Sequence, residues 1–416
     1  MTTATMQTTN VRQNFVQFAD WLAVSVAVSL PWSTSATSIL LVLWVIAVLP
    51  TLSVEALRRE LMSPAGGLPA LLWLLGALGM LWADVPWHDR FAGLEGFIRL
   101  LAIPILFAQF RRSDRGMTAL YGYLASATAL LLTSFAFALI PPLQTHGNFY
   151  GVPVKDYIFQ AGEFLMCGFV LLGAAADFRA RLPWRTVLIL TALAVLFLAD
   201  NAFVITSRTS LLVVPFLVAA LGWRMGGSKG VAAACVVGAI IAPILWFSSP
   251  HLRDFTLQSV TDFQRYFASN ALTSGGLHFE FIRKSIAIVA DAPVFGHGTG
   301  SIGAEFQRAT AGEVGAAGVV TVNPHNQIFA VAIQIGYLGA AVLTAMWVAH
   351  VTLFIRGGWV AWAGLVIVIE NIVSSAVNSH LFDFGEGWLY VFGVGVAGGI
   401  VKKLRDQLSL SGDSTS

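Results

Sequence analysis

Long apolar runs separated by short polar connections dominate the pattern of this chain. A membrane-spanning helix needs about 20 predominantly apolar residues, and several runs approach or reach that length. The pattern predicts an all-α protein with about 12 transmembrane helices. The runs lie near residues 15–32, 37–52, 66–82, 91–109, 117–140, 157–176, 186–206, 210–223, 231–248, 325–348, 359–378 and 387–401.

One long polar segment, residues 249–324, interrupts this pattern and contains five of the 24 Lys and Arg residues. It separates the first nine runs, within residues 1–248, from the last three, within residues 325–401. Apolar residues between positions 277 and 289 recur at helical spacing, which predicts an amphipathic helix. We therefore expect a large, mostly helical loop between two membrane parts, and a short tail at residues 402–416.

Composition supports a membrane protein. Hydrophobic residues make up 56% of the chain and charged residues 11%, with a mean hydropathy of +0.75. Soluble domains contain about 25% charged residues, so this chain has too few charges to cover a water-exposed surface. A net charge of +2 gives no reason to expect nucleic acid as a partner. Cys167 and Cys235 lie in apolar runs and predict neither a disulfide nor a metal site.

The basic residues predict an orientation, because cytoplasmic connections of membrane proteins are enriched in Lys and Arg. One set of alternate connections, together with Arg12 and the tail, contains 15 of the 24 basic residues. This side is predicted to be cytoplasmic, with both termini on it. The long polar loop then faces outward, which in a bacterium is the periplasmic side of the inner membrane.

The loop ends on Asn323-Pro324-His325-Asn326, where the tenth helix is predicted to begin at His325. The dipole at a helix N-terminus disfavours a charged imidazole, and a neutral histidine can act as a general base. In the alternative interpretation, Asn323 caps the helix and His325 only lies at the interface. The sequence is consistent with both.

Several arginines are predicted to face outward, among them Arg90 and Arg208. Arg208 lies in a tight turn, where it either reaches the lipid headgroups or binds a phosphate. Arg265 and Arg283 of the long loop have the same two interpretations.

Two other patterns in the loop are weak. His278, Glu280 and His297 do not form a recognisable set of metal ligands. Residues 298–303 fit a Gly-x-Gly-x-x-Gly motif but lack the preceding strand of a dinucleotide-binding unit.

Three segments together resemble the O-antigen ligase family, which shares its core with O-antigen polymerases and O-oligosaccharyltransferases. The first is Ser207-Arg208. The second is Arg283, followed by the run from Asp291 to Gly300. The third is Asn323-Pro324-His325-Asn326, with the family's His-x10-Gly spacing met by Gly336. The family's Arg-x3-Leu pattern is not met, because Ala287 stands where leucine is expected.

This resemblance implies a metal-independent, cofactor-free glycosyltransferase of the GT-C type. The donor would be O-antigen linked to undecaprenyl diphosphate, and the acceptor the lipid A–core oligosaccharide in the membrane. The implied catalytic residues are His325, Arg283 and Arg265. The implied diphosphate ligands are Arg208, Arg265 and Arg283, and the candidate substrate-binding residues are Arg90, Asn323 and Asn326.

The chemistry expected of these residues is direct displacement. Arginine, with a permanent charge and forked donors, can stabilise a departing diphosphate, while His325 takes the proton of the attacking hydroxyl. The sequence offers no carboxylate pair that suggests a covalent intermediate, so we expect inversion at the anomeric carbon.

Three alternatives remain at the level of sequence. An O-antigen polymerase would use the same chemistry on a second lipid-linked chain. A protein O-oligosaccharyltransferase would usually have a longer periplasmic C-terminal region. A transporter of lipid-linked glycans would instead show inverted repeats and charges at the bilayer midplane.

Overall fold

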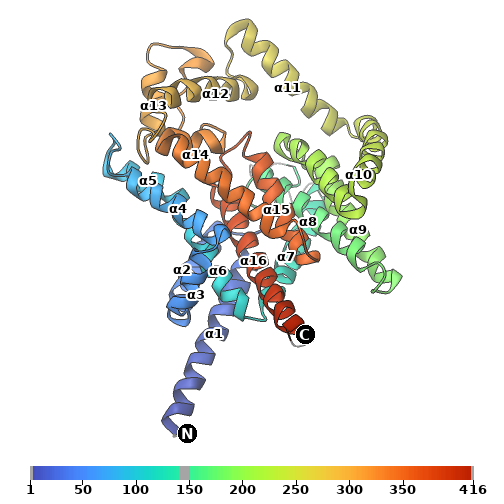
Figure 1. Ribbon diagram of the computed structural model, residues 1–416. Coiled ribbons are helices and arrows are strands. Elements are labelled where there is room, and N and C mark those ends of the chain that lie inside the picture. The colour runs from blue at the N-terminus through green and yellow to red at the C-terminus, as the bar shows by residue number, and fades with distance from the viewer. Residues whose placement is uncertain (1–2, 141–149, 414–416) are drawn as a thin grey trace.

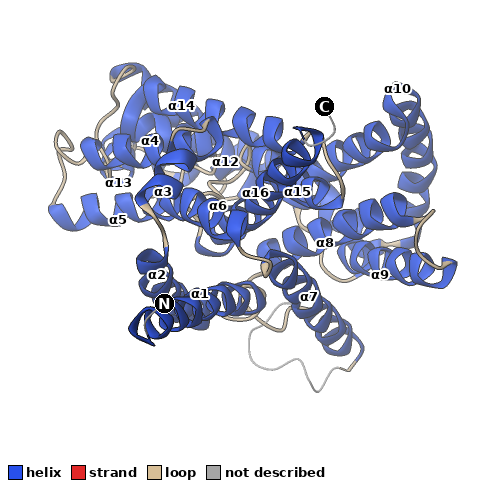
Figure 2. Ribbon diagram, turned by 60° about the horizontal axis from the view of Figure 1, so that its bottom comes forward, coloured by secondary structure: helices blue, strands red, loops and turns tan. Residues whose placement is uncertain are grey.

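The computed structural model describes residues 3–140 and 150–413, and the chain is all-α over these residues, without a strand (Figures 1 and 2). The predicted all-α class is confirmed for these residues. The α-helices are α1 (Thr3–Ser29), α2 (Thr34–Val48), α3 (Val54–Leu61), α4 (Pro64–Gly79), α5 (Trp87–Ile98), α6 (Ala102–Arg112), α7 (Gly116–Leu139), α8 (Tyr157–Phe178), α9 (Trp184–Phe203), α10 (Arg208–Ser248), α11 (Pro250–Ser269), α12 (Ser274–Asp291), α13 (Ile302–Ala309), α14 (Gln327–Phe354), α15 (Trp359–Ser374) and α16 (Phe384–Asp413). Short 3₁₀ helices are η1 (Leu49–Thr51), η2 (Arg99–Leu101) and η4 (Gly315–Gly318).

The molecule is a polytopic membrane protein. In the described part of the chain, eight helices are long and apolar enough to cross a membrane. The number is nine if α3 and α4, which meet at 87°, form one bent span. Every apolar run found in the sequence is largely helical, but the total of about 12 crossings remains a prediction.

One helix combines two predicted spans. α10 covers both residues 210–223 and 231–248 and reverses at Gly226 and Gly227, whose backbone is non-helical. A Cβ atom on Gly222 would lie only 2.7 Å from the carbonyl oxygen of Gly230, so the two arms pack closely beyond the turn. α10 therefore consists of two arms that can each cross the membrane.

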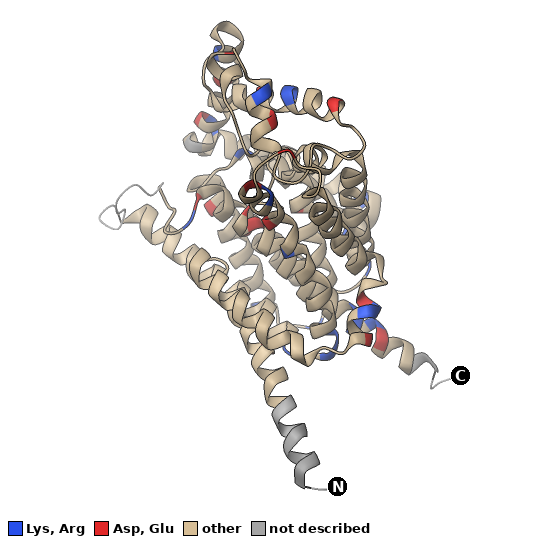
Figure 3. Cartoon of the chain, turned by 90° about the vertical axis from the view of Figure 1, so that its left-hand side faces the viewer, with Lys and Arg blue, Asp and Glu red and all other residues tan. Residues whose placement is uncertain are grey.

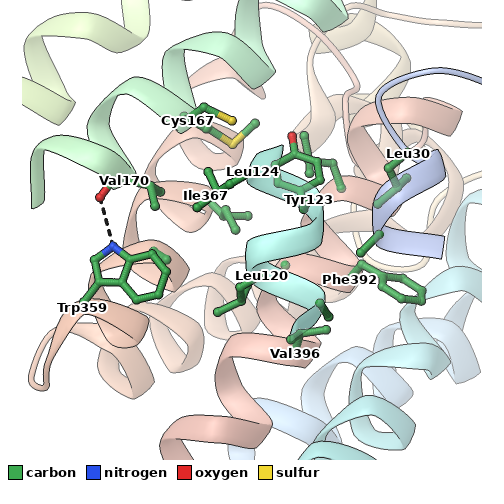
Figure 4. Close-up of a pocket in the computed structure, with 16 residues that line it drawn as sticks. Leu30, Leu120, Tyr123, Leu124, Cys167, Val170, Trp359, Ile367, Phe392 and Val396 are labelled. Carbon is green, nitrogen blue, oxygen red and sulfur yellow. Dashed lines mark hydrogen bonds between the residues drawn. The ribbon is translucent and has the colours of Figure 1, made fainter. Parts of the chain in front are cut away.

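The helix bundle has an apolar core in which large aromatic side chains are fully buried. Trp362 of α15, for example, is inaccessible and donates a hydrogen bond from Nε1 to the carbonyl oxygen of Phe169 in α8 at 2.8 Å. An apolar cavity of about 60 Å³ lies between α1, α7, α8, α15 and α16 (Figure 4). Its lining, which includes Leu120, Ile367 and Phe392, offers almost no polar surface for chemistry.

The long polar segment forms a layer of its own at one end of the bundle. α11, α12 and α13 lie at the end opposite to the start of α1 and the end of α16 (Figure 1). Charged residues are frequent in this layer and near the opposite end of the bundle, and sparser in the helices between (Figure 3). This arrangement is the one expected of a bundle whose middle lies in lipid.

Two predicted boundaries need correction. α14 begins at Gln327 rather than at His325, because the side chain of Asn326 accepts a hydrogen bond from the amide of Phe329 and caps the helix. The last helix does not end near residue 401 but continues as α16 to Asp413, so the predicted tail is mostly helical. Residues 414–416 of that tail lie outside the described residues.

α14 is broken at Ile335 and Gly336, and the segment 293–300 packs against the break. The amides of His297 and Gly298 donate to the carbonyl oxygens of Ile333 and Gln334 at 2.8 and 2.9 Å. These contacts use carbonyl groups that the interrupted helix leaves without an internal partner. The last part of the outer layer is thereby joined to a membrane helix.

The same segment also contacts α4. The Thr299 amide donates to the carbonyl oxygen of Gly79 at 3.0 Å, and its hydroxyl donates to that of Gly76 at 2.6 Å. The run 293–300 therefore lies wedged between two membrane helices, and its glycines permit the close approach.

Candidate active site

His325 lies in the loop just before α14, with a left-handed backbone (φ 51°) that non-glycine residues rarely adopt. The side chain of Asn323 supports this conformation, since its Oδ1 accepts a hydrogen bond from the His325 amide at 2.9 Å. The interpretation that Asn323 caps the helix is therefore wrong; Asn326 does so. Both asparagines position the loop that holds His325.

A chain of hydrogen bonds fixes the imidazole. Nδ1 of His325 lies 2.9 Å from Oδ1 of Asn378, and Nδ2 of Asn378 donates to Oγ1 of Thr209 at 3.1 Å. Because the amide nitrogen of Asn378 donates to Thr209, its oxygen faces the imidazole and accepts a hydrogen bond from the Nδ1–H group. This tautomer leaves the lone pair on Nε2, which has no hydrogen-bond partner among the described residues.

The surroundings of His325 keep it neutral. Its ring stacks on Phe281 of α12, with centroids 5.8 Å apart and planes 8° from parallel, and its centroid lies 4.5 Å from that of His278. Burial lowers the pKa of His325 below its ordinary value of 6.5, and His278 lowers it further, while the hydrogen bond to Asn378 acts in the opposite direction. The cause expected from the sequence was a helix dipole; the main cause is burial.

The loop between α15 and α16 contributes residues that the sequence analysis missed. Asn378 and His380 are 9% and 3% exposed. Burial lowers the pKa of His380 to about 4, and the nearby His325 acts in the same direction. The only sequence signal was a polar Asn-Ser-His run at the outward end of the eleventh predicted helix.

Arg208 is brought near this site through its neighbour in sequence, Thr209. Its guanidinium donates from Nη2 to Oδ2 of Asp262 in α11 at 3.0 Å and lies 5.4 Å from the ring of Phe255. Its Nε is buried and has no hydrogen-bond partner within residues 3–140 and 150–413. One third of the side chain (34%) is exposed, so the ion pair is partly open to an incoming anion.

Arg283 lies on α12, the helix that contacts His325, but its side chain is directed to carboxylates. Nη2 lies 2.8 Å from Oε2 of Glu280 and 3.7 Å from Oε2 of Glu313. The hydrogen bond to Glu280 is the main reason that the pKa of Arg283 is raised further above its ordinary value. Half of the side chain (51%) is exposed.

The remaining candidate arginines are less closely connected to His325. Arg265 is exposed on α11, without an ion pair in the part of the chain that the structure describes. Arg90 donates to the carbonyl oxygens of Met80 and Val85 at 2.7 and 2.8 Å, and lies over the ring of Trp87. These contacts satisfy carbonyl groups just after α4, so Arg90 has a structural role there.

A small cavity with several ionisable residues in a largely apolar lining lies beside the site, between α8, α15 and α16. It is lined by Thr209, His380, Glu163 and Glu370, among others, and its volume of about 10 Å³ is close to what one water molecule requires. Among the described residues, no three His, Cys, Asp or Glu side chains are arranged to hold a metal ion.

Together these groups can take up a proton and attract an anion. A neutral imidazole with a free Nε2 can accept a proton from a hydroxyl group. Arg208 and Arg283 are partly exposed although their partners Asp262 and Glu280 are buried, so each guanidinium can also present N–H donors to an anion such as a diphosphate.

Comparison with known proteins adds one match. A family model described as O-antigen ligase matches residues 193–344, from the middle of α9 to α14. This stretch contains Arg208, Arg265, Arg283 and His325. No curated protein matches the chain.

Proposed function

We propose that this chain, whose residues 193–344 match the O-antigen ligase family model, is itself an O-antigen ligase. In this proposal it is a GT-C-type enzyme of the bacterial inner membrane with both termini in the cytoplasm. It transfers polysaccharide from undecaprenyl diphosphate to a sugar hydroxyl of lipid A–core oligosaccharide on the periplasmic side. The observation that carries the proposal is the imidazole of His325, which Asn378 fixes and which packs on α12, at the end of the bundle opposite the start of α1 and the end of α16.

In the proposed reaction, Nε2 of His325 accepts the proton of the attacking hydroxyl. The hydroxyl oxygen forms a new bond to the anomeric carbon of the donor sugar as the bond from that carbon to the diphosphate oxygen breaks. The electron pair leaves with the diphosphate, and the configuration at the carbon is inverted. General base catalysis of this kind typically contributes about 10²–10⁴-fold to the rate.

The leaving diphosphate gains negative charge, which the arginines stabilise. Arg208 supports this role best, because Thr209 beside it is hydrogen-bonded to Asn378, the residue that holds His325. Arg283 supports it through α12, which contacts His325 with Phe281 and His278. Arg265 would contribute from α11, and Asn323 and Asn326 would keep the loop in place.

The first test is an assay with purified protein, lipid-linked O-antigen and lipid A–core. We expect His325→Ala to lower kcat by about 10²–10⁴-fold while donor binding stays normal. His88→Ala is a matched control, since His88 lies on α5 with a side chain that is 91% exposed. Full activity of His325→Ala would contradict the proposed base.

A second test concerns the diphosphate. We expect Arg208→Ala to weaken the binding of undecaprenyl diphosphate by about tenfold to a hundredfold, because hydrogen bonds to charged groups are worth about 1.5–3 kcal/mol. Arg253→Ala is the control, because it removes an arginine of α11 with a similarly exposed side chain (37%), paired loosely with Asp254 at 3.8 Å. Equal affinities of the two variants would exclude Arg208 as the main ligand.

Deleting the gene separates ligase from polymerase. Loss of a ligase leaves bare lipid A–core while lipid-linked polymer of full length accumulates. Loss of a polymerase leaves core that bears a single repeat unit, and this second result would exclude the proposed acceptor.

A further inference from the structure

We propose that His278 is a substrate-binding residue of the same site, and that its Nε2 accepts a hydrogen bond from a second hydroxyl of the acceptor sugar, close to the one that attacks. This inference rests on the proposed function and specifies its acceptor. The acceptor would present two neighbouring hydroxyl groups to a pair of imidazoles, one from α12 and one from the loop before α14.

The geometry of the pair is the basis of the proposal. The two ring centroids lie 4.5 Å apart, with the planes at 48°. Nδ1 of His278 lies 2.8 Å from the carbonyl oxygen of Ser274, one turn earlier in α12. A carbonyl oxygen only accepts, so Nδ1 carries the proton and Nε2 keeps its lone pair. His325 is held in the same tautomer by Asn378.

Both imidazoles thus offer an acceptor nitrogen to the site, and neither Nε2 has a partner among the residues described. Both side chains are only partly buried. Neither Nε2 is among the buried atoms that lack a partner, so water can reach both, and a ligand that brings an O–H group can replace that water. The two imidazoles that offer these acceptors are neighbours, with centroids 4.5 Å apart.

A role of His278 in binding the diphosphate fits less well. Phosphate oxygens are acceptors, so they would require His278 to be protonated. A positive charge at that distance opposes the uptake of a proton by His325. The site already has arginines whose charge is permanent, and these suit an anion better.

The remaining class of ligand is a hydroxyl donor. The attacking hydroxyl occupies Nε2 of His325, so the hydroxyl bound by His278 belongs to a neighbouring position of the acceptor. Two hydrogen bonds fix the orientation of a sugar where one leaves it free to rotate. His278 would therefore help to select which hydroxyl is attacked.

A set of substitutions tests this inference by its effect on KM. We expect His278→Leu to raise KM for lipid A–core about tenfold, the effect of one lost hydrogen bond, with the affinity for undecaprenyl diphosphate unchanged. We expect His278→Gln, whose amide oxygen can accept in place of Nε2, to recover part of this loss. A weaker affinity for the donor, or an unchanged KM for the acceptor, would overturn the inference.

Protection of the unaltered protein from chemical modification reports acceptor binding directly. It requires neither glycan transfer nor a variant that folds. Diethyl pyrocarbonate modifies neutral imidazole, and peptide mapping locates the adduct. We expect lipid A–core alone to protect His278, and farnesyl diphosphate alone to leave it reactive. Protection by the diphosphate instead, or by neither, would overturn the inference. If the unaltered protein ligates but His278 is not protected, only the inference fails; if it does not ligate, the proposed function fails.

Discussion

Two features of His325, its backbone conformation and its hydrogen bond to Asn378, determine the position of its Nε2 atom. Its left-handed backbone costs about 1–2 kcal/mol for an ordinary residue, and the Asn323 side chain offsets part of this by binding the amide. The hydrogen bond to Asn378 sets the tautomer. The strained backbone and the asparagine together determine where the free Nε2 points.

Asn378 should therefore control the pH dependence of transfer. The pKa of His325 is below its ordinary value, so kcat should rise with pH through that lowered pKa and then reach a plateau. In Asn378→Asp a carboxylate faces the imidazolium and raises the pKa, so the rise should shift to higher pH. The measurement is a pH–rate profile of kcat for both proteins.

The matched variant is Asn378→Ala, which removes the acceptor without adding charge. We expect kcat on the plateau to fall about tenfold, because the Nδ1–H group loses its partner at a cost of about 1–3 kcal/mol. Identical profiles for all three proteins would show that Asn378 does not position the base.

At this scale the sequence identified the chemically active residues better than their partners. His325 and Arg208 were recognisable because polar groups in outward turns of a membrane protein stand out. Asn378 lies 53 residues from His325, and the contact arises only when α14 and α15 pack. The ion pairs of Arg283 with Glu280 and Glu313 were likewise hidden, so its side chain was expected to contact a lipid headgroup or a phosphate instead.

Among the elements, the broken helix α14 has the largest influence on the site. Gly336 adopts φ 65°, and a Cβ atom there would collide with the backbone of Val294 and Phe295. The break lets the segment 293–300 reach carbonyl groups inside the bundle. The His-x10-Gly spacing from His325 to Gly336 therefore covers the part of α14 that precedes the break.

Gly336→Ala should destabilise the protein. The left-handed backbone and the collision with Val294 together should cost more than about 1–2 kcal/mol and lower the apparent melting temperature in detergent. Gly238→Ala is the control, since Gly238 lies in a helical arm of α10 and no atom of the described residues would lie within 4 Å of its Cβ. An equal melting temperature for both variants would mean that the break tolerates a side chain.

The helices themselves were predictable because each apolar run is long and bounded by Gly, Pro or charge. What the runs could not predict was the break in α14, which lies within an uninterrupted apolar run. It depends on contacts with the distant segment 293–300 rather than on local composition. The turn of α10 at Gly226 and Gly227, by contrast, lies between two predicted runs.

For the whole molecule, orientation is the main expectation still to be tested. The start of α1 and the end of α16 lie at one end of the bundle, and α11 to α13 at the other (Figure 1). With the basic residues concentrated in the connections near the termini, that end is predicted to be cytoplasmic.

Cysteine labelling in intact cells tests this orientation. In a Cys235→Ser background, an impermeant maleimide should label Ser269→Cys at the end of α11 in cells with a permeable outer membrane. Ser409→Cys in α16 should be labelled only after the inner membrane is opened. Both positions are exposed, so accessibility to the reagent is not limited by folding. The reverse pattern would invert the proposed topology.

The attachment of residues 293–300 to α4 and α14 limits how the outer layer can be exchanged between relatives. A graft of the entire stretch from α11 to His325 would replace segment 293–300 with one shaped to fit another protein's helices. A chimera intended to change acceptor preference should instead be joined before Pro293, so that α11 and α12 come from the donor parent. Segment 293–300 and the helices that it contacts, α4 and α14, would then all come from the recipient.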